Sequence, residues 1–143
     1  MIDILPGLSS TTSALNAERI RMDVVGQNIA NVNTTRGPDG RPYQRQQVVF
    51  ETLLQHAAGA GGGASPQSVH VARIQQDSRP PKLVYEPGHP DANSEGMVAV
   101  PDINLAHEMV DLIAASRAFE ANLAVMKNAR SLAIQTLAIG KRS

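Results

Sequence analysis

Residues 103–139 read INLAHEMVDLIAASRAFEANLAVMKNARSLAIQTLAI, and this stretch decides the fold of the 143-residue chain. It contains neither proline nor glycine, the two residues that most often interrupt a helix. The sequence therefore predicts one continuous helix here, roughly 55 Å long. Because a compact chain of this size has a radius of gyration of about 14 to 15 Å, we expect an elongated molecule.

One side of this predicted helix carries a heptad-like seam, because apolar and small side chains recur at alternating steps of four and three residues. The seam consists of Leu105, Met109, Leu112, Ser116, Phe119, Leu123, Met126, Arg130, Ala133 and Leu137. Asp102 is the expected N-cap. The acidic residues Glu108, Asp111 and Glu120 lie off the seam, so we expect them on a solvated face. Asn122 is either a surface residue or a polar mark of register in a packed interface.

Residues 1–35 predict a second helix with an apolar stripe. Apolar side chains recur every seven residues, with two more three positions further on: Leu8, Leu15, Met22, Ile29, Val25 and Val32. Ser9 or Ser10 is the expected N-cap. We expect the helix to end within residues 31–33, because asparagine tolerates the conformation of helix ends and a Gly-Pro pair follows at 37–38.

The middle of the chain, residues 36–101, has a different composition. It contains eight of the nine prolines and eight of the eleven glycines. Short β-like pieces at residues 47–51, 68–74, 82–86 and 96–100 predict a small β-rich module. The Ala/Gly stretch AAGAGGGA at residues 57–64 predicts a flexible link. The expected fold is therefore α+β and elongated, with residues 102–143 forming the C-terminal helical region.

Composition narrows the functions that remain. Thirteen basic and thirteen acidic residues give no net charge, which argues against phosphate-driven nucleic-acid binding. The chain has no cysteine, and 19 of its apolar residues are alanine, so a thick core is not expected. His107 and Asp111 have a metal-ligand spacing, but no third ligand accompanies them. We expect no catalytic residues, no metal, no cofactor, no membrane insertion and no cleaved signal peptide, since Asp3 and Pro6 interrupt the N-terminal apolar run.

An asparagine-rich cluster at residues 28–35, NIANVNTT, stands out from the rest of the chain. Helix termination alone is one explanation. Three asparagines in six residues exceed what one helix end needs, so their amides are also candidates to satisfy backbone groups of a neighbouring chain. The sequence leaves both explanations open.

The stretch VVGQNIANVNTTR, residues 24–36, closely resembles the N-terminal signature of bacterial flagellar rod, hook and hook-associated proteins. YQRQQVVFE at residues 43–51, LVYEPGHPDAN at residues 83–93 and DINLAHEMVDLIAASRAFEAN at residues 102–122 resemble the proximal rod proteins of this family. The family commonly has tyrosine at the position of Phe119, so this chain keeps the ring without the hydroxyl.

This resemblance implies that the N- and C-terminal helices pair as a coiled-coil-like layer beside the β-rich module. It implies a structural, non-enzymatic subunit of the periplasmic rod of the flagellar basal body, which transmits torque and leaves the cell by type III export. Implied partners are further copies of the chain, proximal and distal rod subunits, the rod-to-membrane-ring adaptor and the export apparatus. A soluble coiled-coil adaptor is the alternative. The residues expected to pack subunits or carry the motif are Asn28, Ile29, Ala30, Asn31, Asn33, Thr34, Met109, Leu112, Ser116, Arg117, Phe119, Glu120, Asn122, Leu123 and Met126.

Overall fold

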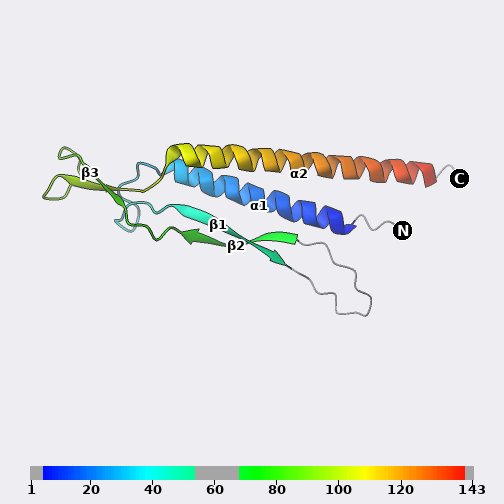
Figure 1. The fold of residues 1–143 in the computed structure, drawn as a ribbon, viewed down its shortest axis with the longest axis horizontal. Coiled ribbons are helices and arrows are strands. Elements are labelled where there is room, and N and C mark those ends of the chain that lie inside the picture. The colour runs from blue at the N-terminus through cyan, green and yellow to red at the C-terminus, as the bar shows by residue number, and fades with distance from the viewer. Residues whose placement is uncertain (1–4, 54–67, 141–143) are drawn as a thin grey trace.

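The computed structural model describes residues 5–53 and 68–140. Its elements follow in the order α1 (Leu5–Ala30), β1 (Gln46–Leu53), β2 (Ser68–Gln76), β3 (Lys82–Tyr85), β4 (Met97–Val100) and α2 (Leu105–Gly140). Two antiparallel pairs, β1–β2 and β3–β4, make up the β part. The molecule is elongated (Figure 1), and the α+β prediction is confirmed. The predicted flexible link lies outside the described residues.

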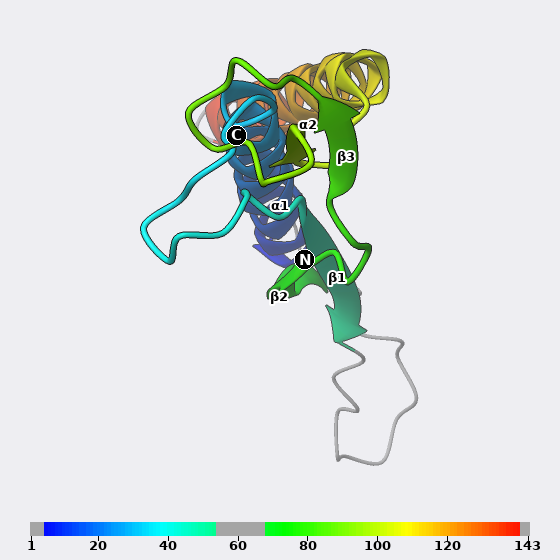
Figure 2. The ribbon, with the colours of Figure 1, turned by 90° about the vertical axis from the view of Figure 1, so that its left-hand side faces the viewer.

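α1 is the central element, because it lies between two layers. α2 runs antiparallel along one side of α1, and the β1–β2 hairpin covers another (Figures 1 and 2). Ala17, Val24 and Val25 are buried. From residue 8 onward, the exposed positions of α1 form a single stripe, made of Ser9, Thr12, Asn16, Arg19, Asp23, Gln27 and Ala30. This stripe is almost entirely polar, so from residue 8 onward the large apolar side chains of α1 are all buried or partly buried.

The two ends of α1 differ in how well the sequence predicted them. The helix begins at Leu5, so the expected cap at Ser9 or Ser10 is wrong. Pro6 does not prevent the earlier start, since an N–H in the first turn has no helical acceptor to lose. At the other end, the Asn31 Nδ2 atom donates to the Gln27 carbonyl at 2.9 Å. The helix therefore ends within one residue of the expected position.

α2 is capped by Asn104, and the expected cap at Asp102 is wrong. The Asn104 Oδ1 atom accepts hydrogen bonds from the backbone N–H groups of Ala106 at 3.0 Å and His107 at 3.2 Å. Asp102 lies three residues before the first helical residue, and its carboxylate instead contacts the Arg79 guanidinium at 3.1 Å. An amide side chain next to the helix satisfies amides that a more distant carboxylate does not reach.

The face of α2 that packs on α1 shares its middle part with the predicted seam and differs from the seam near the start of the helix. Glu108 and Ala115 are fully buried, whereas Leu105 and Met109 are about half exposed. The seam residues that are partly buried are Leu112, Ser116, Phe119, Leu123, Met126 and Ala133. The predicted seam therefore lies on the packed side from Leu112 to Met126, and its exposed members lie toward the two ends of α2: Leu105, Met109, Arg130 and Leu137.

The two hairpins have well-defined registers. β1 pairs with β2 from Gln46↔Gln76 to Leu53↔Ser68, with a bulge between Val49 and Phe50. β3 pairs with β4 from Lys82↔Val100 to Tyr85↔Met97. The second hairpin lies beyond the ends of the helices, at the end of the molecule opposite the C-terminus (Figure 1).

Candidate functional site

A buried cluster of polar side chains connects three separate parts of the chain. We name it the polar joint; it consists of Asn28, Tyr43, Arg45, Gln46 and Glu108. Asn28 comes from the last turns of α1, residues 43–46 lead into β1, and Glu108 lies in the first turn of α2. The joint therefore fixes the helix pair and the β1–β2 hairpin relative to each other.

Asn28 is the centre of the polar joint, with none of its surface exposed. Its Nδ2 group donates to the Gln46 carbonyl and to the Glu108 Oε2 atom, both at 2.9 Å. Its Oδ1 atom accepts from the Gln46 N–H at 2.9 Å and from the Tyr43 hydroxyl at 3.0 Å. The amide thus pairs with both backbone groups of Gln46, as a neighbouring strand would. These partners all belong to its own chain.

Glu108 is 1% exposed, so the expectation of a solvated face is wrong for this residue. Its carboxylate accepts from Arg45 Nε at 2.6 Å and from Asn28 at 2.9 Å. A carboxylate buried this deeply is tolerated because a cation and an amide both donate to it. Burial, and secondarily the Glu108 charge, raises the pKa of the Tyr43 hydroxyl above its ordinary value of 10.0, which keeps the proton that Tyr43 donates to Asn28.

The asparagine cluster continues into a second contact around Asp91. The Thr34 hydroxyl donates to Asn31 Oδ1 at 3.1 Å, which closes the turn after α1. The next two residues reach the proline-rich turn of the middle module: the Thr35 hydroxyl donates to the Asp91 carboxylate at 2.8 Å, and Arg36 pairs with it at 2.7 Å. The motif therefore attaches the end of α1 to a segment more than fifty residues away.

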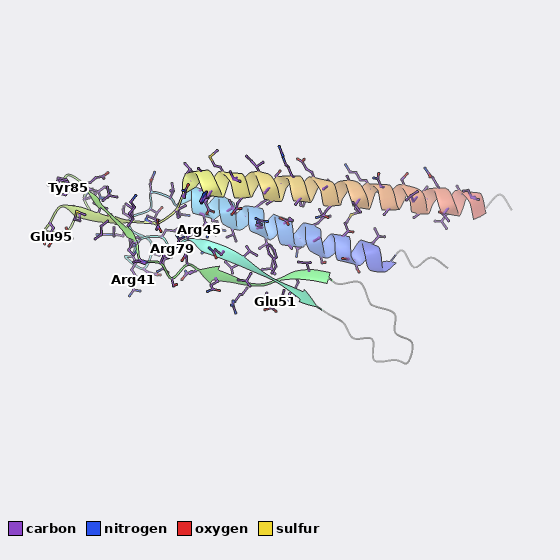
Figure 3. All side chains as sticks on the ribbon, in the orientation of Figure 1. Arg41, Arg45, Glu51, Arg79, Tyr85 and Glu95 are labelled. Carbon is purple, nitrogen blue, oxygen red and sulfur yellow. The ribbon has the colours of Figure 1, made fainter. Side chains whose placement is uncertain are left out.

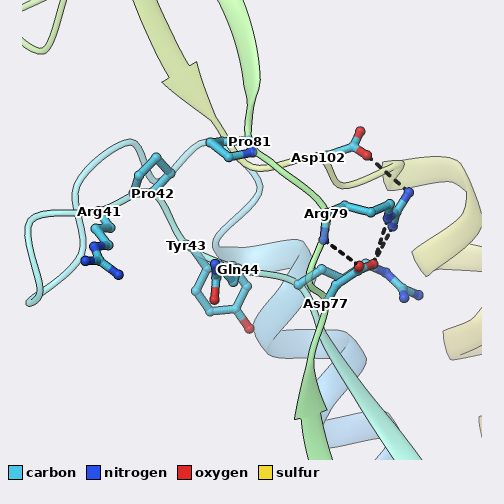
Figure 4. Close-up of a pocket in the computed structure, with 9 residues that line it drawn as sticks. Arg41, Pro42, Tyr43, Gln44, Asp77, Arg79, Pro81 and Asp102 are labelled. Atoms are coloured by element: carbon cyan, nitrogen blue, oxygen red, sulfur yellow. Dashed lines mark hydrogen bonds and ion pairs between the residues drawn. The ribbon is translucent and has the colours of Figure 1, made fainter.

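A pocket of about 230 Å³ lies beside the polar joint (Figure 4). Arg79 crosses its floor and pairs with Asp77 at 2.6 Å and with Asp102 at 3.1 Å. The hydrogen bond from Arg79 lowers the pKa of Asp77 below its ordinary value, so this carboxylate stays charged at neutral pH. Both carboxylates are paired with a cation, and the arrangement links β2 to the start of α2.

The structure places the expected packing residues in two groups. Asn28 is buried; Ile29, Asn31 and Thr34 are partly buried; Ala30 and Asn33 are exposed. On α2, the partly buried members are Leu112, Ser116, Phe119, Asn122, Leu123 and Met126, and the exposed members are Met109, Arg117 and Glu120. The partly buried members lie on or beside the surface between the helices, so the exposed members are the ones available to another molecule.

Sequence reasoning missed the partners of Asn28. Tyr43 and Arg45 stand in the segment YQRQQVVFE, which is notable in the sequence only for its resemblance, and the position of Glu108 beside the seam predicts a solvated face. No spacing rule pairs residue 28 with residue 108. The sequence does contain one chemical hint of this contact. Glu108 is an acid next to an apolar seam, and Arg45, close to a predicted β-strand, is a cation that could pair with it.

The described part of the chain offers little else for chemistry. No group of three His, Cys, Asp or Glu residues in it is placed to hold a metal ion. Neither α1 nor α2, as far as their residues are described, has a segment apolar enough over a sufficient length to cross a bilayer. The polar joint is built for positioning, since each of its hydrogen bonds ends on another group of the chain.

Comparison with known proteins gives matches at both ends of the chain. A family model described as flagella basal body rod protein matches residues 8–38, which span most of α1 and the asparagine cluster. A second model, the C-terminal region of the flagellar basal body rod FlgEFG proteins, matches residues 94–139, which span β4 and nearly all of α2.

Several relatives match over almost the entire length. The flagellar basal-body rod protein FlgC of Borreliella burgdorferi is 40% identical over 147 residues, covering 95% of this chain and 97% of the relative. FlgC of Yersinia enterocolitica is 40% identical over 129 residues, covering 90% and 92%. FlgC of Bacillus subtilis is 37% identical over 144 residues, covering 94% and 96%. These matches, at 37 to 40% identity over nearly the whole chain, show that it belongs to the family of flagellar basal-body rod proteins FlgC.

Proposed function

We propose that this structural subunit of the flagellar proximal rod is held in the shaft mainly by the outward surface of α2. The observation that carries the proposal is the contrast between the two helices. α1 is covered on two sides and exposes a polar stripe, whereas α2 exposes many large apolar side chains. These are Leu105, Met109, Val110, Ile113, Val125, Leu132, Ile134, Leu137 and Ile139. Monomeric soluble proteins rarely leave so much apolar surface on one element uncovered.

The free energies of burial and of association favour assembly through contacts with several neighbours. Completing the burial of a half-exposed aliphatic side chain is worth about 1 kcal/mol. Nine such side chains together contribute about 9 kcal/mol if one partner covers them all, which is no more than the 4 to 15 kcal/mol that association commonly costs in lost freedom of movement. A single contact is therefore weak, and a stable position requires a subunit to touch several others at once. This is the behaviour expected of a part that adds to the end of a growing shaft.

The polar joint supplies the rigidity that a drive shaft needs. Torque passing through the shaft acts to twist the helix layer against the β layer. Because Asn28 and Glu108 connect α1, α2 and the strand entry through buried hydrogen bonds, such a twist breaks several of them together. We infer that the joint transmits load between the two layers, in contact with other basal-body rod components.

The neighbours of the subunit, its position in the cell and its route of delivery belong to the same proposal. We propose self-association in the rod, proximal and distal rod subunits and the membrane-ring adaptor as neighbours, a periplasmic position, and delivery by the flagellar type III apparatus without a cleaved signal. Among the expected packing residues, the five exposed ones are proposed as contacts to neighbours: Ala30, Asn33, Met109, Arg117 and Glu120.

The test compares the two helices directly. In full-length chains expressed in a strain that lacks the native gene, Ile113→Asp and Val125→Asp each place a charge on the outward surface of α2. Both are expected to abolish swimming and incorporation into purified basal bodies while the circular dichroism spectrum stays unchanged. Asn16→Asp, on the polar stripe of α1, is the matched control and is expected to incorporate normally. Normal incorporation of both α2 variants would refute the proposal.

A further inference from the structure

We infer that the turn around His89 is a pH-sensitive latch, which holds the β3–β4 hairpin to the end of α1 while the imidazole is neutral and releases it when the imidazole is protonated. The inference goes beyond the proposed function and does not depend on it, since it concerns the isolated chain. The latch lies in the loop between β3 and β4. Figure 3 shows Tyr85 and Glu95 of this region at the end of the molecule opposite the C-terminal end of α2.

The β3–β4 hairpin depends on its loops for its position. Within the described residues, neither β3 nor β4 packs on a helix or on the β1–β2 hairpin. The loop follows β3 directly, and the Glu86 N–H donates to the Gly96 carbonyl at 2.9 Å, so loop and strands form one hydrogen-bonded unit. Whatever anchors the loop therefore also orients the strands.

Two consecutive turns build the first half of this loop. The first turn closes with a hydrogen bond from the His89 N–H to the Glu86 carbonyl, and the second with one from the Ala92 N–H to the His89 carbonyl, both at 3.0 Å. Pro90 stands at the second position of the second turn, where a fixed φ suits the backbone. His89 is thus shared by both turns, and it is partly buried.

The His89 ring takes part in the second turn as a hydrogen-bond acceptor. The backbone N–H of Asp91 donates to the His89 Nδ1 atom at 3.0 Å. Asparagine and aspartate side chains commonly accept the N–H two residues further on in the same way. Because Nδ1 is the acceptor, the single proton of the neutral imidazole is on Nε2. A second proton therefore binds at Nδ1, and protonation removes the acceptor.

Asp91 is the residue through which the loop reaches the end of α1. Its carboxylate accepts from the Thr35 hydroxyl at 2.8 Å and pairs with Arg36 at 2.7 Å. Its backbone N–H is held by His89 at the same time. The imidazole thus fixes the backbone from which the anchoring carboxylate projects, so losing this hydrogen bond loosens the anchor.

The charges around the latch act in the same direction. The described contacts bring three charged residues to this turn: Asp91 and Glu86 from the loop, Glu86 through its carbonyl group, and Arg36 from the segment after α1. Arg36 is 67% exposed, so water screens its repulsion of a cationic imidazole. A protonated His89 therefore loses the Asp91 N–H and also competes with Arg36 for the Asp91 carboxylate.

The latch controls how firmly the exposed apolar side chains of the hairpin are placed. Leu83 and Tyr85 are 58% and 68% exposed. With the latch closed, these side chains have a fixed position relative to the helices. With the latch open, a partner that covers them must also order the hairpin, which costs conformational entropy. Acid therefore lowers the fraction of subunits whose hairpin is ready to pack.

The test is amide hydrogen exchange of the full-length protein between about pH 5 and pH 8, the range in which histidine side chains ordinarily titrate. Measured rates are corrected for the intrinsic rate at each pH. In the natural chain, the protection of residues 86–96 is expected to fall about 2- to 10-fold toward acid pH. The Thr34 amide, which donates to the Asn31 carbonyl at 3.0 Å beside the anchor, should lose protection in parallel.

His89→Asn is the informative variant, because an asparagine side chain accepts the same N–H and does not titrate. It is expected to keep residues 86–96 protected across the whole pH range. His89→Ala removes the acceptor and should give low protection throughout. His107→Asn is the matched control, since His107 is exposed in the first turn of α2, and it should keep the pH response of the natural chain.

Three results would overturn the inference. One is protection of residues 86–96 that does not change with pH in the natural chain. Another is a pH response that persists in His89→Asn, which would place the titrating group elsewhere. The third is a response confined to the loop while the Thr34 amide is unaffected, because the turn would then titrate without acting on the end of α1. Failure of the proposed function leaves these measurements unchanged, since they require no assembly.

Discussion

Replacing Asn28 by alanine is the sharpest test of the polar joint. The substitution removes four hydrogen bonds, two to the backbone of Gln46 and one each to Tyr43 and Glu108. Each such bond contributes about 0.5 to 1.5 kcal/mol, so the four amount to about 2 to 6 kcal/mol. The higher helix propensity of alanine returns about 0.6 kcal/mol. We expect Asn28→Ala to lower the free energy of unfolding by about 3 kcal/mol or more.

Urea denaturation followed by circular dichroism measures this loss. With an m-value of about 1 to 3 kcal/mol per molar urea, the transition midpoint should fall by about 1 to 3 M. Asn16→Ala makes the same substitution at an exposed position of the same helix, and it should change the midpoint only slightly. If the two variants lose equal stability, or if Asn28→Ala loses less than about 1 kcal/mol, the joint does not hold the layers together.

Two further outcomes test neighbouring features. Tyr43→Phe removes one hydrogen bond to Asn28 and should cost about 1 kcal/mol. Because the folded state raises the pKa of Tyr43, the contribution of this residue to stability should be constant below pH 10 and be lost as the pH rises above it, and pH-dependent urea titrations should show a smaller fall at high pH in the phenylalanine variant. Gly96→Ala and Gly40→Ala both place alanine at a positive φ, of 73° and 72°, but only the alanine at position 96 would also clash with Tyr85. Amide hydrogen exchange in β3–β4 should therefore accelerate more in Gly96→Ala than exchange around residue 40 accelerates in Gly40→Ala.

The sequence predicted the elements of this fold better than their contacts. Proline and glycine mark the middle module so clearly that the four strands were located to within about three residues at each end. Long uninterrupted stretches did the same for the helices. The caps were harder to predict, since Asp102 and Asn104 are both suitable residues and only the position of the first turn decides between them.

Apolar spacing located the middle of the packing face of α2 but not its start. A buried acid such as Glu108 looks like a surface residue until Arg45 and Asn28 are placed beside it. An apolar residue such as Met109 looks like core although it is exposed within the single chain. Apolar periodicity does not say by itself whether a side chain is covered within its own chain.

The polar joint also has a consequence for the timing of folding during synthesis. Its components stand at positions 28, 43–46 and 108, and the carboxylate is the last of them to leave the ribosome. Until then the Arg45 side chain and one proton of the Asn28 amide have no acceptor, so burying them is unfavourable. An incomplete chain therefore gains little by closing around α1. The hydrogen bonds of the polar joint therefore delay the packing of the layers around α1 until about three quarters of the chain is present.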